Sequence, residues 1–218
     1  MSDKQYAVIG LGRFGLSVCR ELQSSGAQVL AVDIDEDRVK EAAAFVSQAI
    51  VANCTSEETV KELRLDDYDM VMVSIGSDVN SSILTTLVVK ESGAKAVWVK
   101  ANDKFHGKIL SKIGADHIIM PERDMGIRVA RKMLDRRVLE FIDLGSSLAM
   151  TEIVIGAKLL GKQLRELKLC KETGVEVLGF KRGPNLTKAP DLDVSLEIGD
   201  VVIIAGPKET LSRKLRNW

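Results

Sequence analysis

The sequence predicts an α/β fold built on a doubly wound parallel sheet, followed by a second, smaller α+β domain. Between residues 5 and 120, six short apolar runs alternate with segments of helical periodicity, an order typical of a parallel sheet with right-handed crossovers. A G-x-G-x-x-G pattern directly follows the first run, as in folds that bind nucleotides at a helix N-terminus. After residue 136 the pattern changes to short strands separated by turns, which indicates a separate domain.

The first strand, loop and helix form the most informative stretch. Residues 6–9 read as a buried strand, and the helix that follows has an apolar face. Gly10 permits a tight turn, Gly12 lets the backbone approach a pyrophosphate, and Gly15 lets the helix pack closely on the strand. Arg13, inside the loop, either grips the terminal phosphates with its guanidinium fork or points into water. The loop therefore predicts a site for an adenosine-type nucleotide, with a purely structural glycine turn as the alternative.

The second strand, AQVLAVDID over residues 27–35, ends in acidic residues. Asp33 stands 21 residues beyond Gly12, close to the offset at which a carboxylate accepts hydrogen bonds from the ribose hydroxyls. A 2′-phosphate would be repelled there. Ile34 and Asp35 complete this end of the strand and belong to the predicted nucleotide site.

The remaining elements of the first domain follow in regular order. Strands are expected at 48–52, 69–76, 96–101 and 117–121, and helices at 35–46, 56–65, 77–93, 103–114 and 121–135. Ser56 or Thr59 suits a helix start, and Gly93 and Gly114 suit helix ends. In this fold, ligands bind at the carboxyl ends of the strands.

Polar residues therefore matter most where the strands end. Asn53 can pair with an adenine edge or cap the next helix. Gly76 and Ser77 permit close approach of a ligand or simply serve the strand-to-helix turn. Lys100 places a cation near the phosphates or lies on the surface. Glu122 opens a helix, where an acid ordinarily just complements the helix dipole.

The helix expected at 121–135 carries two apolar stripes. One stripe holds Met125, Val129 and Met133, and the nearly opposite one holds Ile127 and Leu134. A helix at the rim of a domain has one neighbour from its own sheet, so the second stripe predicts a linker helix packed against another subunit or domain. We assign residues 1–137 to a nucleotide-binding domain that includes this helix.

The second domain covers residues 138–218. Strands are expected at 138–144, 148–155, 174–182 and 200–206, with a helix at 159–167 and a solvated terminal helix from 208. This domain contains no histidine and no acid with an obvious catalytic neighbour, whereas hydride transfer would need a proton donor or acceptor beside the cofactor. The sequence thus favours an unreactive nucleotide sensor, not an enzyme, over an NAD(H)-binding redox sensor or oxidoreductase.

Composition excludes several classes of function. The 31 basic residues balance the 31 acidic ones, so no overall field attracts nucleic acid or an anionic bilayer. Neither a signal peptide nor a stretch of 18 uncharged apolar residues occurs, so a cytosolic location is expected. Cys19, Cys54 and Cys170 form no pair typical of a disulfide or zinc site and are expected to be buried. His106 and His117 lack metal-binding spacing and are expected in surface or packing positions.

Motifs along nearly the whole chain resemble those of RCK domain proteins of the TrkA type, the regulators of potassium conductance, and among them the cytosolic subunits of bacterial Ktr potassium uptake systems. The motifs are YAVIGLGRFGLSV (6–18), AVDIDE (31–36), VANCTSEE (51–58), WVKAND (98–103), KIGADHIIMPERDMG (112–126), LLGKQLREL (159–167) and LEIGDVVIIAGP (196–207). The resemblance implies a Rossmann-like N-terminal RCK lobe and its C-terminal partner lobe.

The resemblance also implies a homo-octameric ring of dimers, docked on a KtrB-type potassium-translocating membrane protein, with ATP favouring the active ring and ADP the inactive one. It implies that the three glycines form the phosphate loop, that Arg13 contacts the terminal phosphate near a dimer interface, and that Asp33 contacts the ribose. Further nucleotide contacts are implied for Phe14, Asn53, Cys54, Ile75, Gly76, Ser77 and Lys100. Glu122, in PERDMG, would hold a divalent cation beside the γ-phosphate. Some relatives bind a cyclic dinucleotide in the second lobe, but no residue set here points to such a site.

Overall fold

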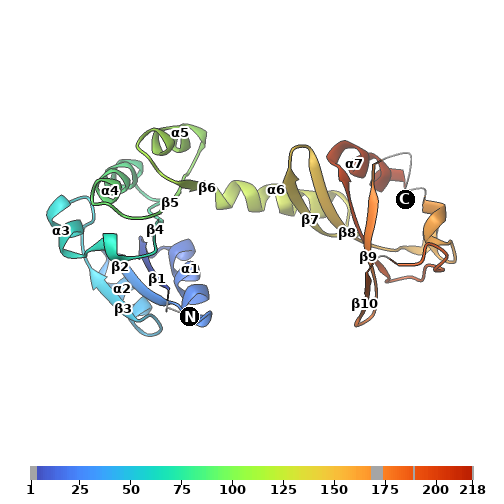
Figure 1. The fold of residues 1–218 in the computed structure, drawn as a ribbon, viewed down its shortest axis with the longest axis horizontal. Coiled ribbons are helices and arrows are strands. Elements are labelled where there is room, and N and C mark those ends of the chain that lie inside the picture. The colour runs from blue at the N-terminus through green and yellow to red at the C-terminus, as the bar shows by residue number, and fades with distance from the viewer. Residues whose placement is uncertain (1–3, 168–173, 189, 218) are drawn as a thin grey trace. The chain divides into compact units, whose positions relative to one another are not determined.

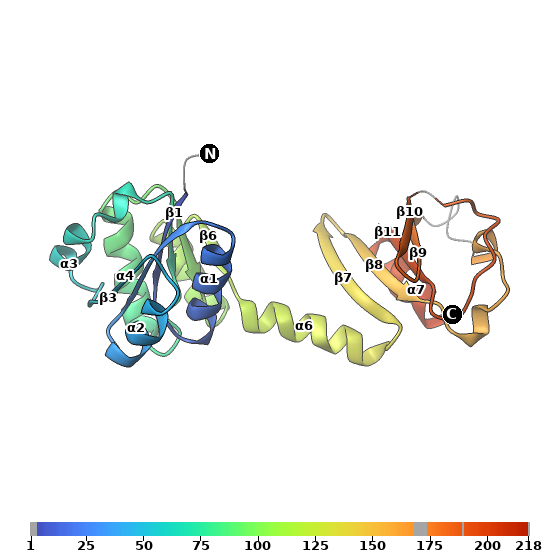
Figure 2. The same cartoon turned by 90° about the horizontal axis from the view of Figure 1, so that it is seen from below.

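The computed structural model describes residues 4–167, 174–188 and 190–217, without the side chains of 214–217. The chain forms two compact units, Met1–Glu122 and Arg123–Trp218 (Figures 1 and 2). Each unit has its own buried apolar core. The two units differ in the kind of sheet that they contain.

Within the described residues, the first unit is built on a six-stranded parallel sheet. Its strands are β1 (Gln5–Ile9), β2 (Gln28–Asp33), β3 (Gln48–Val51), β4 (Met70–Val73), β5 (Val97–Lys100) and β6 (His117–Ile119). They lie in the order β3-β2-β1-β4-β5-β6, which confirms the predicted doubly wound sheet. The order reverses between β1 and β4, so a ligand is expected in the crevice beside the carboxyl ends of these two strands.

Helices cover both faces of this sheet (Figure 1). They are α1 (Arg13–Ser24), α2 (Glu36–Ala43), α3 (Glu57–Glu62), α4 (Val79–Glu91) and α5 (Lys104–Lys112), with a 3₁₀ turn at Leu65–Asp67. Cys19 of α1 and Val39 of α2 pack against one face, whereas Val60, Val89 and Leu110 of α3 to α5 pack against the other. Because the strands are buried on both sides, they read as continuous apolar runs in the sequence.

Side chains at the helix starts explain where the helices begin. Asp35, Ser56, Asp78 and Asp103 each cap a helix by accepting a hydrogen bond from a backbone N–H of its first turn. Gly93 and Gly114 follow α4 and α5 with φ of +88° and +94°, in the left-handed region that favours glycine. The predicted start at Ser56 and the predicted ends at both glycines are confirmed.

Helix α6 (Pro121–Leu134) begins at the predicted proline, and none of its residues is buried. The side chains of both predicted apolar stripes, Met125, Ile127, Val129, Met133 and Leu134, are exposed. Arg128 and Lys132, on the same helix, form ion pairs with Glu140 of the following strand. That a neighbouring subunit or domain covers the apolar stripes stays a prediction.

The described part of the second unit contains a five-stranded antiparallel sheet. Its strands are β7 (Val138–Gly145), β8 (Leu148–Val154), β9 (Glu176–Arg182), β10 (Asn185–Lys188) and β11 (Val201–Pro207), in the order β10-β9-β11-β8-β7. Strand β10 was not predicted and pairs with β9 through a hairpin at Gly183, where φ is +56°. The predicted terminal helix is present as α7 (Lys208–Asn217), but it is not wholly solvated, because Leu211 is buried in the core.

The prediction of a helix at 159–167 is wrong. The chain forms two short 3₁₀ segments there, Ala157–Leu159 and Leu164–Leu167. Gly161 has a φ of +77° between them, and its N–H donates to the carbonyl oxygen of Leu196 at 2.8 Å. The N–H of Leu164 likewise donates to the carbonyl oxygen of Val194 at 3.0 Å. Backbone groups bonded to that distant segment cannot also serve an α-helix.

A buried carboxylate holds the turn before β11. Asp200 is 2% exposed and accepts two hydrogen bonds from the Arg182 guanidinium, at 2.9 and 2.7 Å, and one from the Glu197 N–H at 2.7 Å. Burial by itself would raise the pKa of Asp200, but these hydrogen bonds outweigh it and the pKa is lowered. The turn at 197–200 is therefore joined to β9 by a charged pair.

The thiols of the first unit are inert packing groups. Cys19 and Cys54 are buried, as predicted. Burial raises the pKa of each thiol to about 12, so neither is a thiolate at neutral pH. Cys170 lies outside the described residues.

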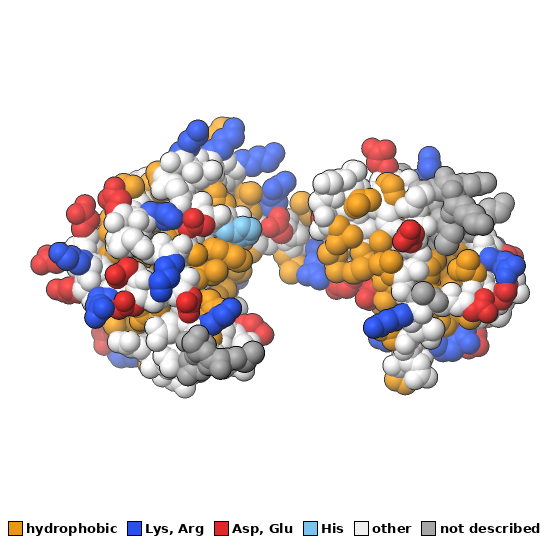
Figure 3. Space-filling view, viewed as in Figure 1, with side chains coloured by type: hydrophobic (Ala, Val, Ile, Leu, Met, Phe, Trp, Pro, Cys, Tyr) orange, Lys and Arg blue, Asp and Glu red, His pale blue; other side chains and the backbone are white. Residues whose placement is uncertain are grey.

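The surface of the described residues mixes polar and apolar side chains. On the face seen in Figure 3, charges of both signs are interspersed with hydrophobic groups. His117 lies on the surface with its ring 4.4 Å from that of Trp98, as predicted for a packing or surface residue. No helix in this part of the chain has the length and hydrophobicity that crossing a membrane would require.

Candidate nucleotide site

The glycine loop between β1 and α1 contains two crowded glycines and one open glycine. Gly10 has a φ of +95°, and a Cβ there would stand 2.9 Å from the backbone of Ser74. A Cβ on Gly15 would stand 1.9 Å from the carbonyl oxygen of Gly10. At Gly12, by contrast, a Cβ would meet nothing within 4 Å. Two glycines are thus required by the fold, and the third leaves space beside the loop for a ligand.

Asp33, at the end of β2, is joined to the glycine loop. Its carboxylate is nearly buried, at 7% exposure, and accepts the Leu11 N–H at 2.6 Å and the Asp35 N–H at 2.9 Å, one on each oxygen. Asp33 therefore holds the loop in place. Each carboxylate oxygen keeps a further lone pair, so the predicted role toward ribose hydroxyls is compatible with this geometry and stays a prediction.

The residues after Asp33 differ in what they can offer a ligand. Ile34 is 72% exposed. Asp35 caps α2 by accepting hydrogen bonds from the N–H groups of Asp37 and Arg38. The Arg38 guanidinium lies 3.6 Å from Asp33 and 3.4 Å from Asp35. We did not predict Arg38, although its place three residues after a capping aspartate indicated that it would point back to this edge.

Asn53 and Cys54 follow β3 at the neighbouring position. The Asn53 side-chain oxygen accepts hydrogen bonds from the N–H and hydroxyl of Thr55, at 3.1 and 2.8 Å. The cap of α3 comes from Ser56 instead, so Asn53 shapes the turn before the helix. Burial first, and then the charge of Asp33, raises the pKa of the Cys54 thiol, which places Cys54 near the carboxylate at the end of β2.

The loop after β4 runs beside the glycine loop. The backbone of Ile75 lies 3.0 Å from the position of a Cβ on Gly10. The carbonyl oxygen of Gly76 accepts a hydrogen bond from the Asn102 side chain at 2.8 Å, and Ser77 is exposed. Asn102 was missed by the sequence prediction, although it stands in the same WVKAND motif as Lys100.

Lys100 and Glu122 form an ion pair at the end of β5. The Lys100 ammonium lies 2.5 Å from the Glu122 carboxylate, and its side chain is only 12% exposed, whereas that of Glu122 is 69% exposed. The ammonium is also 3.2 Å from the position of a Cβ on Gly76 and 6.0 Å from the Phe14 ring. The hydrogen bond from Lys100 is the main cause that lowers the pKa of Glu122; burial opposes it, and the charges of Lys100 and Arg13 lower the pKa further.

Arg13 is the first residue of α1 and is exposed. Its charge contributes to the lowered pKa of Glu122, and the ring of the next residue, Phe14, has its centroid 6.0 Å from the Lys100 ammonium, so the start of α1 lies near the ion pair. The structure therefore brings Arg13, Phe14, Lys100 and Glu122 together around the loop and β4. Asp33, Cys54 and Arg38 gather at the ends of β2 and β3. The site thus has one end with two cations and a carboxylate, and another end with carboxylates and a guanidinium.

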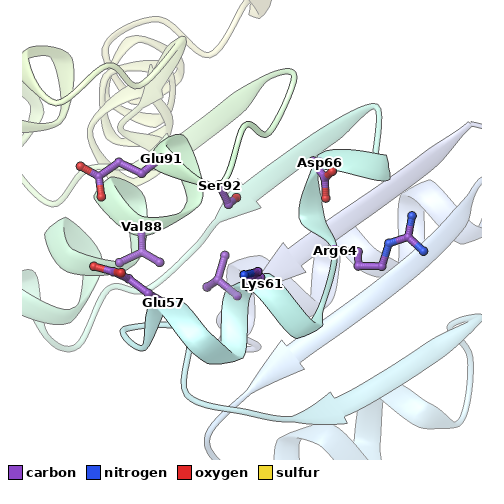
Figure 4. Close-up of a pocket in the computed structure, with 8 residues that line it drawn as sticks. Glu57, Lys61, Arg64, Asp66, Val88, Glu91 and Ser92 are labelled. Atoms are coloured by element: carbon purple, nitrogen blue, oxygen red, sulfur yellow. The ribbon is translucent and has the colours of Figure 1, made fainter.

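A hollow of about 450 Å³ lies elsewhere in the first unit, between α3 and α4. Its lining is mixed in charge (Figure 4) and includes the apolar Val60 and Val88. None of the predicted site residues lines it. The hollow therefore does not bear on the nucleotide site.

A cation at Glu122 would need ligands from outside the chain. Among the described residues, no group of three or more His, Cys, Asp or Glu side chains is placed to hold a metal ion. A single carboxylate with phosphate oxygens is, however, the way in which magnesium is commonly bound beside a nucleotide. The predicted cation at Glu122 would need ligands besides this carboxylate and stays a prediction.

Comparison with known proteins shows similarity along the whole chain. Residues 6–121 match the TrkA-N domain and residues 149–217 the TrkA-C domain. The chain is 72% identical to Ktr system potassium uptake protein A of Vibrio alginolyticus, over 99% of this chain and 98% of that protein. It is 41% identical to Ktr system potassium uptake protein C of Bacillus subtilis, over 96% of this chain and 95% of that protein.

Solved structures share the fold at lower identity. The GsuK channel matches 97% of this chain with a TM-score of 0.67 and 18% identity, and the match covers 38% of that channel. The GsuK channel bound to NAD matches the full chain with a TM-score of 0.54, over 39% of its own length. This chain therefore corresponds to well under half of the channel chain, and the likeness concerns the fold alone.

Proposed function

This chain belongs to the Ktr family of potassium uptake regulatory subunits, which carry TrkA-N and TrkA-C (RCK) domains, and from this we propose that it senses ATP against ADP. In the proposal, the nucleotide state of the first domain sets the activity of a KtrB-type potassium-translocating partner. The chain acts as a regulator and not as an enzyme. It works from the cytoplasm, at the inner face of the membrane, where its partner holds it.

The observation that carries the proposal is the gathering of Lys100, Glu122 and Arg13 beside the glycine loop. The loop and the start of α1 suit phosphate oxygens. The side chains of Arg13 and Lys100 can then form charged hydrogen bonds with a terminal phosphate. Glu122 can hold a divalent cation between itself and that phosphate. A diphosphate would leave part of this set without a ligand, so the geometry supports discrimination between ATP and ADP.

The discrimination that regulation needs is small. A tenfold shift between two states requires about 1.4 kcal/mol of differential binding, within reach of one hydrogen bond to a charged group. Glu122 is the second residue of α6, and α6 continues the chain toward the TrkA-C domain. Any change in the partners of Glu122 therefore acts directly on the start of that helix.

The proposed assembly is a homo-octameric ring of dimers. Its support is the exposed apolar surface of α6, both of whose stripes are exposed among the described residues, together with membership of the Ktr family. A helix with two exposed apolar stripes is stabilised when other surfaces bury them. Light scattering on the purified protein would measure the size of the assembly.

NAD(H) is the second candidate ligand. The GsuK channel, a structural neighbour, has been solved with NAD, and Asp33 would suit the ribose of either nucleotide. The charged end of the site favours ATP, because NAD has no terminal phosphate for Arg13 and Lys100 to bind or for a cation at Glu122 to bridge.

Titration of the purified protein with ATP, ADP and NADH tests the proposal. We expect ATP and ADP to bind more tightly than NADH, and Arg13→Ala to remove the difference between ATP and ADP while retaining part of the ADP affinity. Arg20→Ala is the matched control, because Arg20 lies on the same helix and pairs with Glu41 away from the loop. Tight NADH with weak ATP would favour the second candidate, and unchanged discrimination would remove Arg13 from the mechanism.

A further inference from the structure

His106 in α5 is buried in a way that its packing does not explain. It is 3% exposed, and its Nδ1 accepts a hydrogen bond from the Asn102 N–H at 3.2 Å. Its Nε2 has no hydrogen-bond partner among the described residues. A leucine would fill a similar volume without leaving a buried polar atom unpartnered. The distinctive contribution of the histidine is therefore the acceptor at Nδ1.

The start of α5 does not require that acceptor. Asp103 already caps the helix, because its carboxylate accepts hydrogen bonds from the N–H groups of Phe105 and His106 at 2.7 and 2.9 Å. The bond from Asn102 to His106 therefore fixes the residue that precedes the cap. That residue is the one whose side chain donates to the carbonyl oxygen of Gly76 at 2.8 Å.

Burial favours the form of His106 that can accept this bond. Desolvation lowers the pKa of His106, and the nearby charge of Asp103 opposes it only in part. The ring is consequently neutral, and a neutral ring with the proton on Nε2 presents Nδ1 as an acceptor. The hydrogen-bond network thereby assigns the tautomer.

We propose that His106 is a positioning residue for the nucleotide site, acting through Asn102 on the loop at 75–77. His106 orients Asn102, and Asn102 holds the Gly76 carbonyl at the distance that leaves room beside the glycine loop. Gly76 in turn borders the Lys100 ammonium, so the relay ends at the phosphate-binding end of the site. The inference rests on the proposed function, since the ligand is the nucleotide proposed above.

A relay of this kind makes a different prediction from a phosphate contact. It shapes the site for both nucleotides, so its loss weakens ATP and ADP alike. Loss of Arg13, by contrast, changes their ratio. Two members of one relay are also not additive, because removing either breaks the same connection.

The experiment compares His106→Leu, which removes the acceptor, with His106→Asn, whose side-chain oxygen can replace Nδ1. Asn102→Ala and the double variant with His106→Leu complete the series, all in the full chain. We expect His106→Leu and Asn102→Ala each to weaken ATP and ADP binding about tenfold, the value of one buried hydrogen bond. His106→Asn should retain most of the affinity, and the double variant should be no weaker than either single one.

Amide hydrogen exchange at residues 75–78 without nucleotide gives a readout that does not depend on the ligand. It should speed up equally in His106→Leu and Asn102→Ala. Thr85→Val is the matched control, because Thr85 is likewise buried with a hydroxyl that has no partner in the described part of the chain, and both readouts should stay as in the wild type. Normal exchange and affinity in His106→Leu, or additive losses in the double variant, would overturn the relay. A wild-type chain that binds neither nucleotide would instead overturn the proposed function, and this role with it.

Discussion

Asp200 in the second unit and Glu122 in the first each pair with a cation, yet the two pairs stand in opposite surroundings. Asp200 is buried and accepts hydrogen bonds from Arg182 and from the Glu197 N–H. Glu122 reaches a nearly buried lysine from a side chain that is 69% exposed. A carboxylate enclosed by its own chain stabilises the fold, whereas one open to solvent can exchange its partner for a ligand. The comparison shows that an ion pair by itself does not identify a site: the exposed carboxylate of Glu122 is free to exchange partners, as the proposed function requires, and the enclosed one of Asp200 is not.

The largest expected effect comes from the glycine loop, where Gly15 is enclosed by neighbouring atoms and Gly12 has open space beside it. Gly15→Ala should abolish folding of the first unit, because the added methyl group would overlap the Gly10 carbonyl oxygen. Gly12→Ala should leave the melting temperature nearly unchanged, since its φ of −69° suits alanine and the space around it is open. Its methyl group would nevertheless occupy the approach to the phosphates, and ATP binding should fall at least tenfold. Circular dichroism and calorimetric titration measure the two properties, and equal behaviour of the two variants would contradict the distinction.

The next effect concerns the buried carboxylate. Asp200→Ala should destabilise the second unit by about 2 kcal/mol, because the Glu197 N–H and the Arg182 guanidinium lose their acceptor. Hydrogen exchange of β9 and β11 under mild denaturant reports this unit by itself. The control is Asp193→Ala, which breaks an exposed pair with Arg165 and should cost well under 1 kcal/mol. Equal losses in the two variants would show that burial does not matter here.

The pH dependence of stability gives a more specific test of the pair between Asp200 and Arg182. Because the pKa of Asp200 is lower in the folded chain, its contribution is complete above the unfolded value of about 3.9 and disappears as the pH falls through the folded value. The stability gap between wild type and Asp200→Asn should therefore be constant from pH 7 to 5 and shrink below about pH 4. A gap that widens with acid would mean that the pKa is shifted in the other direction.

The smallest effect on stability belongs to Glu122. Glu122→Gln should leave unfolding almost unchanged, since the side chain is mostly exposed and such pairs contribute little. It should still reduce the preference for ATP over ADP about tenfold in the presence of magnesium, while ADP binding without magnesium changes little. Parallel titrations with and without magnesium test this, and a large loss of stability would place Glu122 with the structural charges.

Much of the first unit was readable from the sequence because local signals agreed with the fold. Apolar runs, helix caps and the glycine loop each predict the same alternating order, and the sheet has that order. The helix prediction for 159–167 failed because the apolar spacing of this segment suits a helix. The segment instead turns at Gly161 and forms backbone hydrogen bonds to 192–196, a part of the chain that is distant in sequence. Asn102 was missed for a similar reason, since its partner Gly76 follows another strand, whereas Arg38 had a local signal in its spacing from Asp35. Polar side chains that act between strand ends carry no periodic signal.

The pairing of Lys100 with Glu122 has a consequence for how such a site would report on the cell. A nucleotide arriving there meets charges that already satisfy one another, so binding is a substitution in which old contacts are given up as new ones form. The net gain is small, and occupancy turns over readily. Such a sensor would follow the proportion of the two nucleotides wherever their concentrations lie well above both dissociation constants, because competition alone then sets which of them is bound.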